Sequence, residues 1–286
     1  MRGANQLELD LSPLTRPLQL TTALLLDSND TDTLASMSAS PRRVLVCSDF
    51  DWSWADQDTD RYVFEVLAPH LRTSLRASKK THQWTDNCAE HLRKLHAEGF
   101  GKEDVLGALR QVPVHPAMRR AFVDLKASKD PQVTTFILSN ANSVYIDTIL
   151  KHYGVENAID EVVTNPAQFR DDGLLELRRR VDPNGPQHQC KVGCSPNMCK
   201  GEELEAFMAR NGGWESFDKV IYIGDGANDL CPILHLRSQD VALVRLYREL
   251  YRRLQDSTAA HTSDVKCKVV SWGGAWEVEK WLKEEL

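Results

Sequence analysis

Short apolar runs recur along the chain, and stretches with helical periodicity separate most of them. The runs are only five to eight residues long and rich in β-branched residues, which is typical of strands buried on both faces. We predict six strands, at Val44–Ser48, QVTTFILS (132–139), EVVTNP (161–166), KVIYIGD (219–225), DVALVR (240–245) and VKCKVV (265–270). Helices are predicted between them at Val144–Tyr153, Gly201–Arg210 and Tyr247–Leu254. This alternation predicts an α/β protein with a parallel sheet covered by helices on both faces.

The interval between the first two strands is helical in pattern throughout. It holds three amphipathic stretches, RYVFEVLAPHLRTSLRA (61–77), WTDNCAEHLRKLHAEGF (84–100) and KEDVLGALRQV (102–112). A further helix is expected to start at Pro116, because proline is tolerated in the first turn. We therefore predict an α/β core at 42–59 and 113–286, with a small helical cap at 60–112 inserted after the first strand.

Composition and charge narrow the class of protein. The first part of the chain, residues 1–41, is rich in Ser, Thr and Asp and is predicted to be a poorly ordered extension. With 286 residues, 42% hydrophobic residues and a formal charge of -6, the chain suits a folded core and does not favour a nucleic-acid partner. No apolar run reaches the roughly 20 residues of a membrane helix, so no membrane partner is expected. Seven cysteines, an odd number, without a signal peptide favour reduced thiols and a cytoplasmic location.

Carboxylates gather where three of the predicted strands end. Asp49 and Asp51 follow the first strand, and Asp225 and Asp229 lie in GDGAND at the end of another. The strand between them ends in Ser139-Asn140. Ligands of open parallel sheets bind beyond the carboxyl ends of the strands, so we expect these residues to converge on one edge. Several carboxylates at one point suit a hard divalent cation such as Mg²⁺, which prefers oxygen ligands and a substrate phosphate.

These motifs resemble the haloacid dehalogenase superfamily. Asp49-Phe50-Asp51-Trp52-Ser53 looks like its first motif, D-x-D-x-[T/V], although Ser53 stands where Thr is usual, and Ser139 fits its second. Lys200 fits the third motif, and GDGAND fits the fourth. The stretches DFDWSWADQDTD, LSNANSVYID, VVTNPAQF, SPNMCKGEEL and YIGDGANDLCP are similar to the branch containing phosphoethanolamine/phosphocholine phosphatase and pyridoxal phosphate phosphatase. The resemblance implies a Rossmann-like core with a cap.

The resemblance also implies a set of roles. Asp49 would be the nucleophile that forms an aspartyl-phosphate, and Asp51 the general acid and base. Ser139 and Lys200 would contact the phosphoryl group, with Asn140 contributing a backbone N–H group. Mg²⁺ would be held by Asp49, by the backbone carbonyl of Asp51, and by Asp225, with Asp229 either a direct ligand or an organiser of waters. By their position, Trp52, Trp54 and Asp56 are expected at the cap entrance and are the candidates to meet the leaving group. Packing at the boundary of core and cap is the favoured alternative for the two tryptophans, and a solvated carboxylate is the alternative for Asp56.

Several alternatives remain open at this stage. Phosphocholine, phosphoethanolamine, pyridoxal phosphate and thiamine phosphate are all possible substrates, and a phosphotransferase or mutase could use the same fold. A non-catalytic, zinc-linked binding protein is the alternative outside the enzymes. It would rest on His188, Cys190, Cys194 and Cys199, whose irregular spacing instead favours ordinary thiols in a loop. The sequence predicts no oligomeric state.

Overall fold

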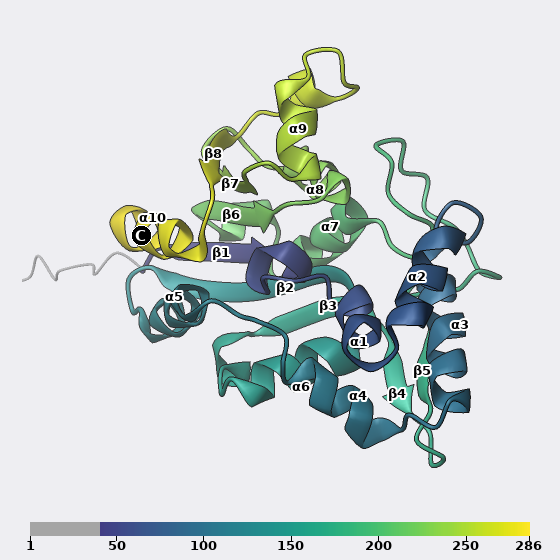
Figure 1. The fold of residues 1–286 in the computed structure, drawn as a ribbon. Coiled ribbons are helices and arrows are strands. Elements are labelled where there is room, and N and C mark those ends of the chain that lie inside the picture. The colour runs from purple at the N-terminus through teal and green to yellow at the C-terminus, as the bar shows by residue number, and fades with distance from the viewer. Residues whose placement is uncertain (1–40) are drawn as a thin grey trace, which may run out of the picture. The chain divides into compact units, whose positions relative to one another are not determined.

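A six-stranded parallel sheet forms the centre of the protein. The computed structural model describes residues 41–286, and the extension predicted at 1–41 lies almost wholly outside the described residues. The strands follow the order β3-β2-β1-β6-β7-β8 (Figure 1). Their bounds are β1 Arg43–Ser48, β2 Gln132–Asn142, β3 Glu161–Asn165, β6 Lys219–Gly224, β7 Val241–Arg245 and β8 Lys268–Trp272. The predicted Rossmann-like α/β fold is therefore confirmed.

Helices cover both faces of this sheet, as alternating side chains along each strand require. Val44 and Val46 of β1 belong to one hydrophobic cluster, and Leu45 and Cys47 belong to the other. The first face packs against α5 (Pro116–Ala127), α6 (Ser143–His152) and α10 (Ala275–Glu285). The second packs against α7 (Lys200–Arg210), α8 (Leu230–Ile233) and α9 (Glu249–Gln255). The inner strands β1, β6 and β7 are buried on both faces, so their sequences read as continuous apolar runs, whereas the edge strand β8 is largely exposed.

Four helices lie between β1 and α5. They are α1 (Thr59–Leu67), α2 (Pro69–Ser78), α3 (Trp84–Ala97) and α4 (Lys102–Leu109), and Figure 1 shows them beside the carboxyl edge of the sheet. The stretch predicted as one helix at 61–77 is two, because Pro69 forces Ala68 out of helical geometry to φ -149° and ψ 77°. The division into a core and a separate cap at 60–112 stays a prediction.

Short elements complete the described residues. A hairpin turns at Asp172-Gly173, where β4 (Ala167–Phe169) pairs with β5 (Leu175–Leu177) and Gly173 takes φ +89°. A π-helical turn, η1 (Phe50–Trp54), follows β1. Four 3₁₀ turns lie at η2 (Glu156–Ala158), η3 (Trp214–Ser216), η4 (Ala227–Asp229) and η5 (Thr262–Asp264). Among residues 41–286, no helix is both long enough and apolar enough to cross a membrane.

The pairing register brings the strand ends to one edge. Ser48 of β1 pairs with Ile137 of β2 and with Ile223 of β6. The next residues along these three strands therefore reach the rim together. Strand β2 was expected to end at Ser139 but continues to Asn142, with a register shift against β3 between Leu138 and Asn142. This irregularity leaves Ser139 and Asn140 at the rim rather than in a regular ladder.

Trp54 is part of the core. Its side chain is 1% exposed, its ring stacks on Phe50 at 5.7 Å between centroids, and it meets the edge of Phe122 at 5.9 Å. The expectation that Trp54 meets the leaving group was therefore wrong. The reason is the π-helical turn, in which Trp52 takes φ +59°, so that the tryptophan side chains are placed on different sides of the turn.

We expect Trp54→Ala to lower the free energy of unfolding by about 3–5 kcal/mol, because it removes a large, fully buried aromatic side chain. Trp276 is 56% exposed and provides the matched control, for which Trp276→Ala should change stability by less than about 0.5 kcal/mol. Urea denaturation measures both. Equal effects of the two substitutions would contradict a core role for Trp54.

Candidate active site

Three buried carboxylates meet at the rim of the sheet. Asp49 follows β1, Asp225 follows β6, and Asp229 ends η4. One carboxylate oxygen from each lies within 4.8 Å of the others. All three side chains belong to residues less than 9% exposed. Three like charges at this separation repel one another, so the cluster requires cations to compensate them.

Lys200 supplies the first of these cations. Its side chain is fully buried, and its Nζ lies 2.8 Å from Asp49 Oδ2 and 2.7 Å from Asp229 Oδ1. Burial alone would lower the pKa of Lys200, but the attraction of Asp229 and then Asp49 outweighs it and raises the pKa. Lys200 is therefore a permanent positive charge that joins two carboxylates.

Asp229 has all its acceptor positions in use. Its Oδ1 accepts hydrogen bonds from Lys200 Nζ and from the Tyr222 hydroxyl, both at 2.7 Å. Its Oδ2 accepts from the backbone N–H groups of Asp225 at 3.0 Å and Gly226 at 2.9 Å. The side chain also presses against Gly224, where an added Cβ would lie 2.8 Å from Asp229. This arrangement favours Asp229 as an organiser of the loop and of Lys200 rather than as a direct metal ligand.

Asp49 and Asp225 are the carboxylates left to face the cavity. Asp49 Oδ1 accepts a hydrogen bond from Phe50 N at 2.6 Å, which fixes its orientation. Burial, opposed by Lys200, raises the pKa of Asp49 to about 6. Burial together with the charges of Asp49 and Asp229 raises the pKa of Asp225 to about 8. Both pKa values are raised first by burial, which makes the charged form of these carboxylates costly unless a cation lies beside them.

This donor set fits Mg²⁺. Asp49 and Asp225 offer hard carboxylate oxygens that converge in a buried cluster, and a dication would supply the missing positive charge. Asp225 Oδ2 is 3.2 Å from Arg248 Nε. A cation would therefore meet a carboxylate that is already held in place. The backbone carbonyl of Asp51 remains the third predicted contact.

Asp51 lies in the cavity beside a second group of acids. Its Oδ1 accepts hydrogen bonds from the Thr59 hydroxyl at 2.8 Å and the Thr59 backbone N–H at 3.2 Å. Burial and the nearby charges of Asp58 and Asp60 raise its pKa well above the ordinary value. A raised pKa favours the protonated carboxyl group, which is the form that can donate a proton to a leaving oxygen as a general acid.

Amide side chains link the β2 edge to the loop before α7. Asn228 Nδ2 donates to Asn140 Oδ1 at 2.9 Å, and Asn140 Nδ2 donates to Asn197 Oδ1 at 3.3 Å. Asn197 Nδ2 donates in turn to Asn165 Oδ1 at 3.1 Å. Ser139, which is 1% exposed, holds the turn through a hydrogen bond that its Oγ accepts from Ala141 N at 3.2 Å. Ser139 and Asn140 thus line the cavity in a fixed frame.

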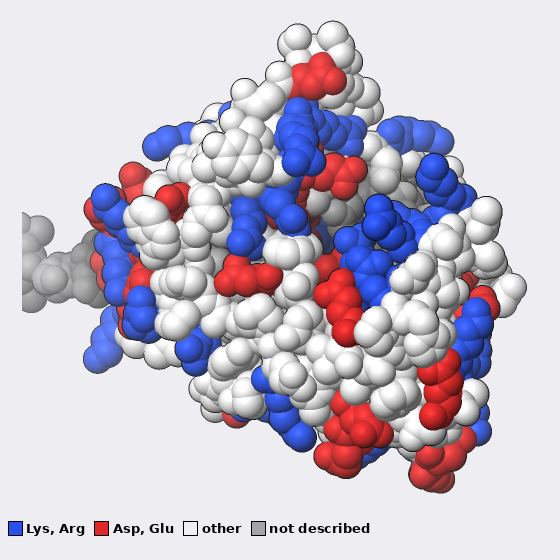
Figure 2. Space-filling model, in the orientation of Figure 1, with Lys and Arg blue, Asp and Glu red and all other residues white. Residues whose placement is uncertain are grey.

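The cavity above the carboxylates has a volume of about 440 Å³ and an opening with mixed charge. Residues of and beside α1, α2 and α3 form one side of it, including Arg61, Lys79 and Trp84, and residues of α9 form the other. Figure 2 shows Lys and Arg side chains on both sides of the hollow between α2 and α9, with acidic side chains between them. Trp52 also lines the cavity, and the guanidinium of Arg248 lies 3.8 Å from its ring centre.

Not every predicted site residue lies in the cavity. Asp56 is absent from its walls and accepts a hydrogen bond from Arg245 Nη2 at 2.8 Å, while Arg245 Nη1 donates to Trp52 O at 2.6 Å. The expectation that Asp56 contacts the leaving group was wrong, because its carboxylate pairs with Arg245 and stabilises the turn. The sequence reasoning missed Asn197, Arg248 and Arg252, whose places depend on tertiary packing. Asn197 alone had a signal, since it lies three residues before Lys200.

The sheet and its rim of carboxylates around a buried lysine define a hydrolase of the haloacid dehalogenase type. Residues 44–286 match the model of the family described as "Putative Phosphatase", and the chain belongs to this family. The protein is a phosphatase, and the predicted superfamily and branch are confirmed.

Two curated relatives are similar to this chain in sequence, and one solved structure is similar to it in fold. The chain is 29% identical to "Pyridoxal phosphate phosphatase PHOSPHO2" of Bos taurus, over 84% of this chain and 98% of the relative. It is 32% identical to "Inorganic pyrophosphatase 1" of Arabidopsis thaliana, over 69% of this chain and 65% of the relative. A phosphoserine phosphatase solved as an analogue of its phospho-aspartyl intermediate has a similar fold, with a TM-score of 0.54 and 14% identity, over 84% of this chain and 99% of that one.

The acids beside Asp51 generate a prediction about stability. Burial and the charge of Asp58 raise the pKa of Asp60 from 3.8 to about 7. The folded state therefore holds this proton more tightly than the unfolded chain, so its contribution to stability is complete below about pH 3.8 and is lost as pH rises towards 7. The substitution Asp60→Asn removes this loss. Its amide oxygen can still accept the hydrogen bond that Trp84 Nε1 donates to Asp60 Oδ2 at 2.7 Å.

We expect Asp60→Asn to raise Tm at pH 8 by about 3 °C or more, and to have a smaller effect at pH 5. Differential scanning fluorimetry across this range measures the difference. Asp171→Asn, in the exposed turn between β4 and β5, is the control and should leave the pH profile unchanged. A parallel shift at both pH values would show that Asp60 is ionised throughout.

Proposed function

We propose that the protein is a Mg²⁺-dependent phosphatase that hydrolyses a small phosphate compound through an aspartyl-phosphate on Asp49. One observation carries the proposal. Lys200 binds Asp49 and Asp229 at once, in a cluster that also contains Asp225 and is open to the cavity. This combination offers an oriented nucleophile, a fixed cation and a place for a second cation, which are the requirements of phosphoryl transfer.

The proposed reaction uses two aspartates in turn. A carboxylate oxygen of Asp49 forms a bond to phosphorus while the bond from phosphorus to the leaving oxygen breaks, and Asp51 donates its proton to that oxygen. Asp51 then takes a proton from a water molecule, whose oxygen attacks the same phosphorus. The bond between Asp49 and phosphorus breaks, inorganic phosphate leaves and both carboxyl groups return to their first state.

The remaining groups stabilise charge. Lys200 lies beside the nucleophilic carboxylate and would neutralise a phosphoryl oxygen, and Ser139 with the backbone N–H of Asn140 would donate hydrogen bonds to the others. Mg²⁺ held by Asp49, Asp225 and the Asp51 carbonyl would offset the repulsion between the carboxylates and the negatively charged phosphoryl group. The hydrogen bonds of Thr59 hold Asp51 in place, so its proton is directed into the cavity.

The charge at the cavity opening supports a substrate with a negatively charged leaving group. Within residues 41–286, Arg61 pairs with Asp58, whereas Lys79 and Arg252 form no ion pair. Glu249 on the same rim also forms none, which leaves one net positive charge among these three exposed side chains, while Asp51 and Asp60 line the cavity further in. The Arabidopsis relative named as an inorganic pyrophosphatase agrees with this preference. We therefore propose pyrophosphate, or a phosphate ester with a further anionic group, rather than phosphocholine.

Asp49→Asn tests the chemistry. We expect it to lower kcat for p-nitrophenyl phosphate by roughly a thousandfold or more, because the amide is neither nucleophilic nor charged. Released phosphate and p-nitrophenol are measured with Mg²⁺ and with EDTA, and EDTA should abolish the wild-type activity. Asp171→Asn is the control for the substitution itself and should keep full activity.

Activity of Asp49→Asn above a tenth of the wild type would remove Asp49 as the nucleophile. Activity that survives EDTA would remove the divalent cation. Release of p-nitrophenol without an equal amount of phosphate, in the presence of an added alcohol, would identify a phosphotransferase instead.

Lys79→Gln tests the class of substrate. Losing one rim charge should lower kcat/KM for pyrophosphate by roughly fivefold and leave that for phosphocholine the same or higher. The matched control is Lys80→Gln, since Lys80 is the next residue, is exposed and does not line the cavity. Equal losses with both substrates, or a wild-type preference for phosphocholine, would contradict an anionic leaving group without affecting the role of Asp49.

A further inference from the structure

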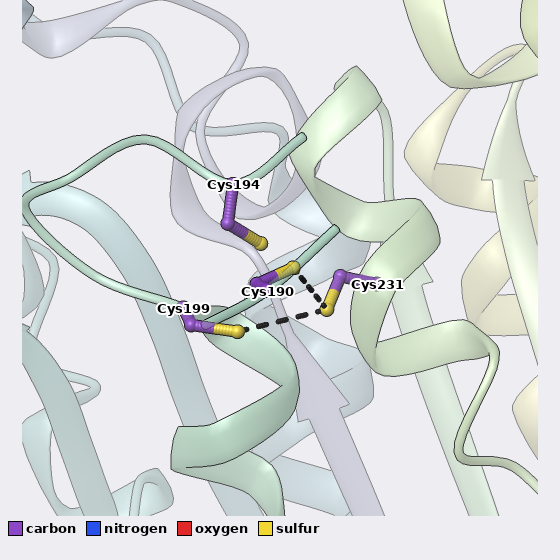
Figure 3. A group of neighbouring side chains, drawn as sticks. All are labelled: Cys190, Cys194, Cys199 and Cys231. Carbon is purple, nitrogen blue, oxygen red and sulfur yellow. Dashed lines mark hydrogen bonds between the residues drawn. The ribbon is translucent and has the colours of Figure 1, made fainter. Parts of the chain in front are cut away.

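Four cysteines meet beside the active site. Cys190 and Cys194 lie in the segment between β5 and α7, Cys199 is the residue before α7, and Cys231 lies in α8. Figure 3 shows their side chains directed towards a common point. All four Sγ atoms lie within 4.8 Å of one another, and the residues are buried or half-buried. The sequence alone did not group Cys231 with the others, because it is 32 residues away from Cys199.

The distances between the sulfur atoms are those of a metal site. Cys190 Sγ lies 3.6 Å from Cys231 Sγ, and Cys199 Sγ lies 3.7 Å from it. A disulfide would require about 2.05 Å. Four thiolates at about 2.3 Å from one Zn²⁺ in a tetrahedron are about 3.8 Å from each other. The observed separations match this tetrahedral edge.

We propose that Cys190, Cys194, Cys199 and Cys231 bind one structural Zn²⁺ ion. Four thiolate ligands complete the tetrahedral coordination that zinc prefers and leave no position for water or substrate. The ion therefore stabilises the fold and takes no part in phosphoryl transfer. This site is separate from the carboxylate cluster, whose oxygen ligands suit Mg²⁺.

The surroundings of the thiols fit this role. Val192 N donates a hydrogen bond to Cys190 Sγ at 3.4 Å, which would stabilise a thiolate. Cys199 is the N-cap of α7, where the helix dipole favours a negative charge. A Cβ on Gly201 would lie 2.7 Å from Cys231 Sγ, so glycine at this position leaves the space that the cluster occupies.

His188 is not one of the four ligands. The zinc alternative drawn from the sequence grouped it with Cys190, Cys194 and Cys199, whereas in the structure the group of four thiols contains Cys231, and His188 falls in a separate group with Cys199 and Glu202. The Nε2 atom of His188 instead lies 2.8 Å from the carbonyl oxygen of Ser195. This exchange changes a mixed and irregular set of ligands into a uniform Cys₄ set.

A zinc ion here would order the approach to the active site. The 22 residues between β5 and α7 (178–199) contain no helix or strand, and such a long segment needs something to hold it. Cys199 is adjacent to Lys200, and Cys231 lies two residues after Asp229. One ion would thus tie the loop to α8 and fix both ends of the Lys200–Asp229 ion pair.

Metal analysis of the purified full chain tests the proposal. We expect about one zinc per chain by plasma mass spectrometry, retained after dialysis against EDTA under conditions that remove Mg²⁺. The variants Cys190→Ser and Cys194→Ser, both in the loop, should lose at least about half of this zinc. Cys267→Ser, at a buried cysteine outside the cluster, is the matched control and should keep it. Zinc below about a tenth per chain in wild type, or equal zinc in all four proteins, would overturn the proposal.

Cobalt provides a test that needs no variant. After zinc is released with an organomercurial and the thiols are regenerated, Co²⁺ added to the anaerobic wild-type chain should give the absorption bands of a tetrahedral thiolate site at one equivalent. Zn²⁺ should then abolish them at one equivalent. No such bands, or a disulfide between any two of the four cysteines in protein isolated anaerobically, would contradict a zinc site. Neither readout depends on phosphatase activity.

Discussion

The ammonium of Lys200 is the contact on which the active site depends. It is fully buried and lies within 2.8 Å of carboxylate oxygens of both Asp49 and Asp229. Removing one partner from such a buried ion pair leaves an uncompensated charge, which costs several kcal/mol. The three residues come from the end of β1, the start of α7 and the turn after β6. One cation therefore fixes three separate elements at the rim of the sheet.

The cluster of Asp49, Asp225 and Asp229 keeps negative charge that a bound cation can compensate. Lys200 and Arg248 offset part of the charge of three carboxylates, and burial raises the pKa of Asp49 to about 6 and that of Asp225 to about 8. A site that is short of positive charge attracts a divalent cation, and the cation in turn attracts phosphate. Basic side chains beside α1 and α2 and on α9 add positive charge at the opening of the cavity, further from the carboxylates.

The sequence predicted the residues proposed for phosphoryl transfer better than the residues that surround them. Asp49 and Asp225 could be found because each directly follows an apolar strand, and Ser139 because it ends the apolar run within β2. The side of the turn on which Trp54 lies could not be found. It depends on the positive φ of Trp52, a conformation that the composition of the stretch gives no reason to expect. Arg248 and Cys231 were missed because only tertiary packing brings them to their sites.

The carboxylate and thiol clusters share the same two short pieces of backbone. Cys199-Lys200 enters α7, and Asp229 and Cys231 lie two residues apart where η4 meets α8. Each piece thus sends one side chain to the carboxylates and another to the thiols. A shift of α8 against α7 large enough to separate Cys199 from Cys231 would also move Asp229 away from Lys200. The distance between Lys200 and Asp229 therefore depends on how firmly α7 and α8 pack against each other. This contact lies at the end of the long segment 178–199, which has no regular secondary structure.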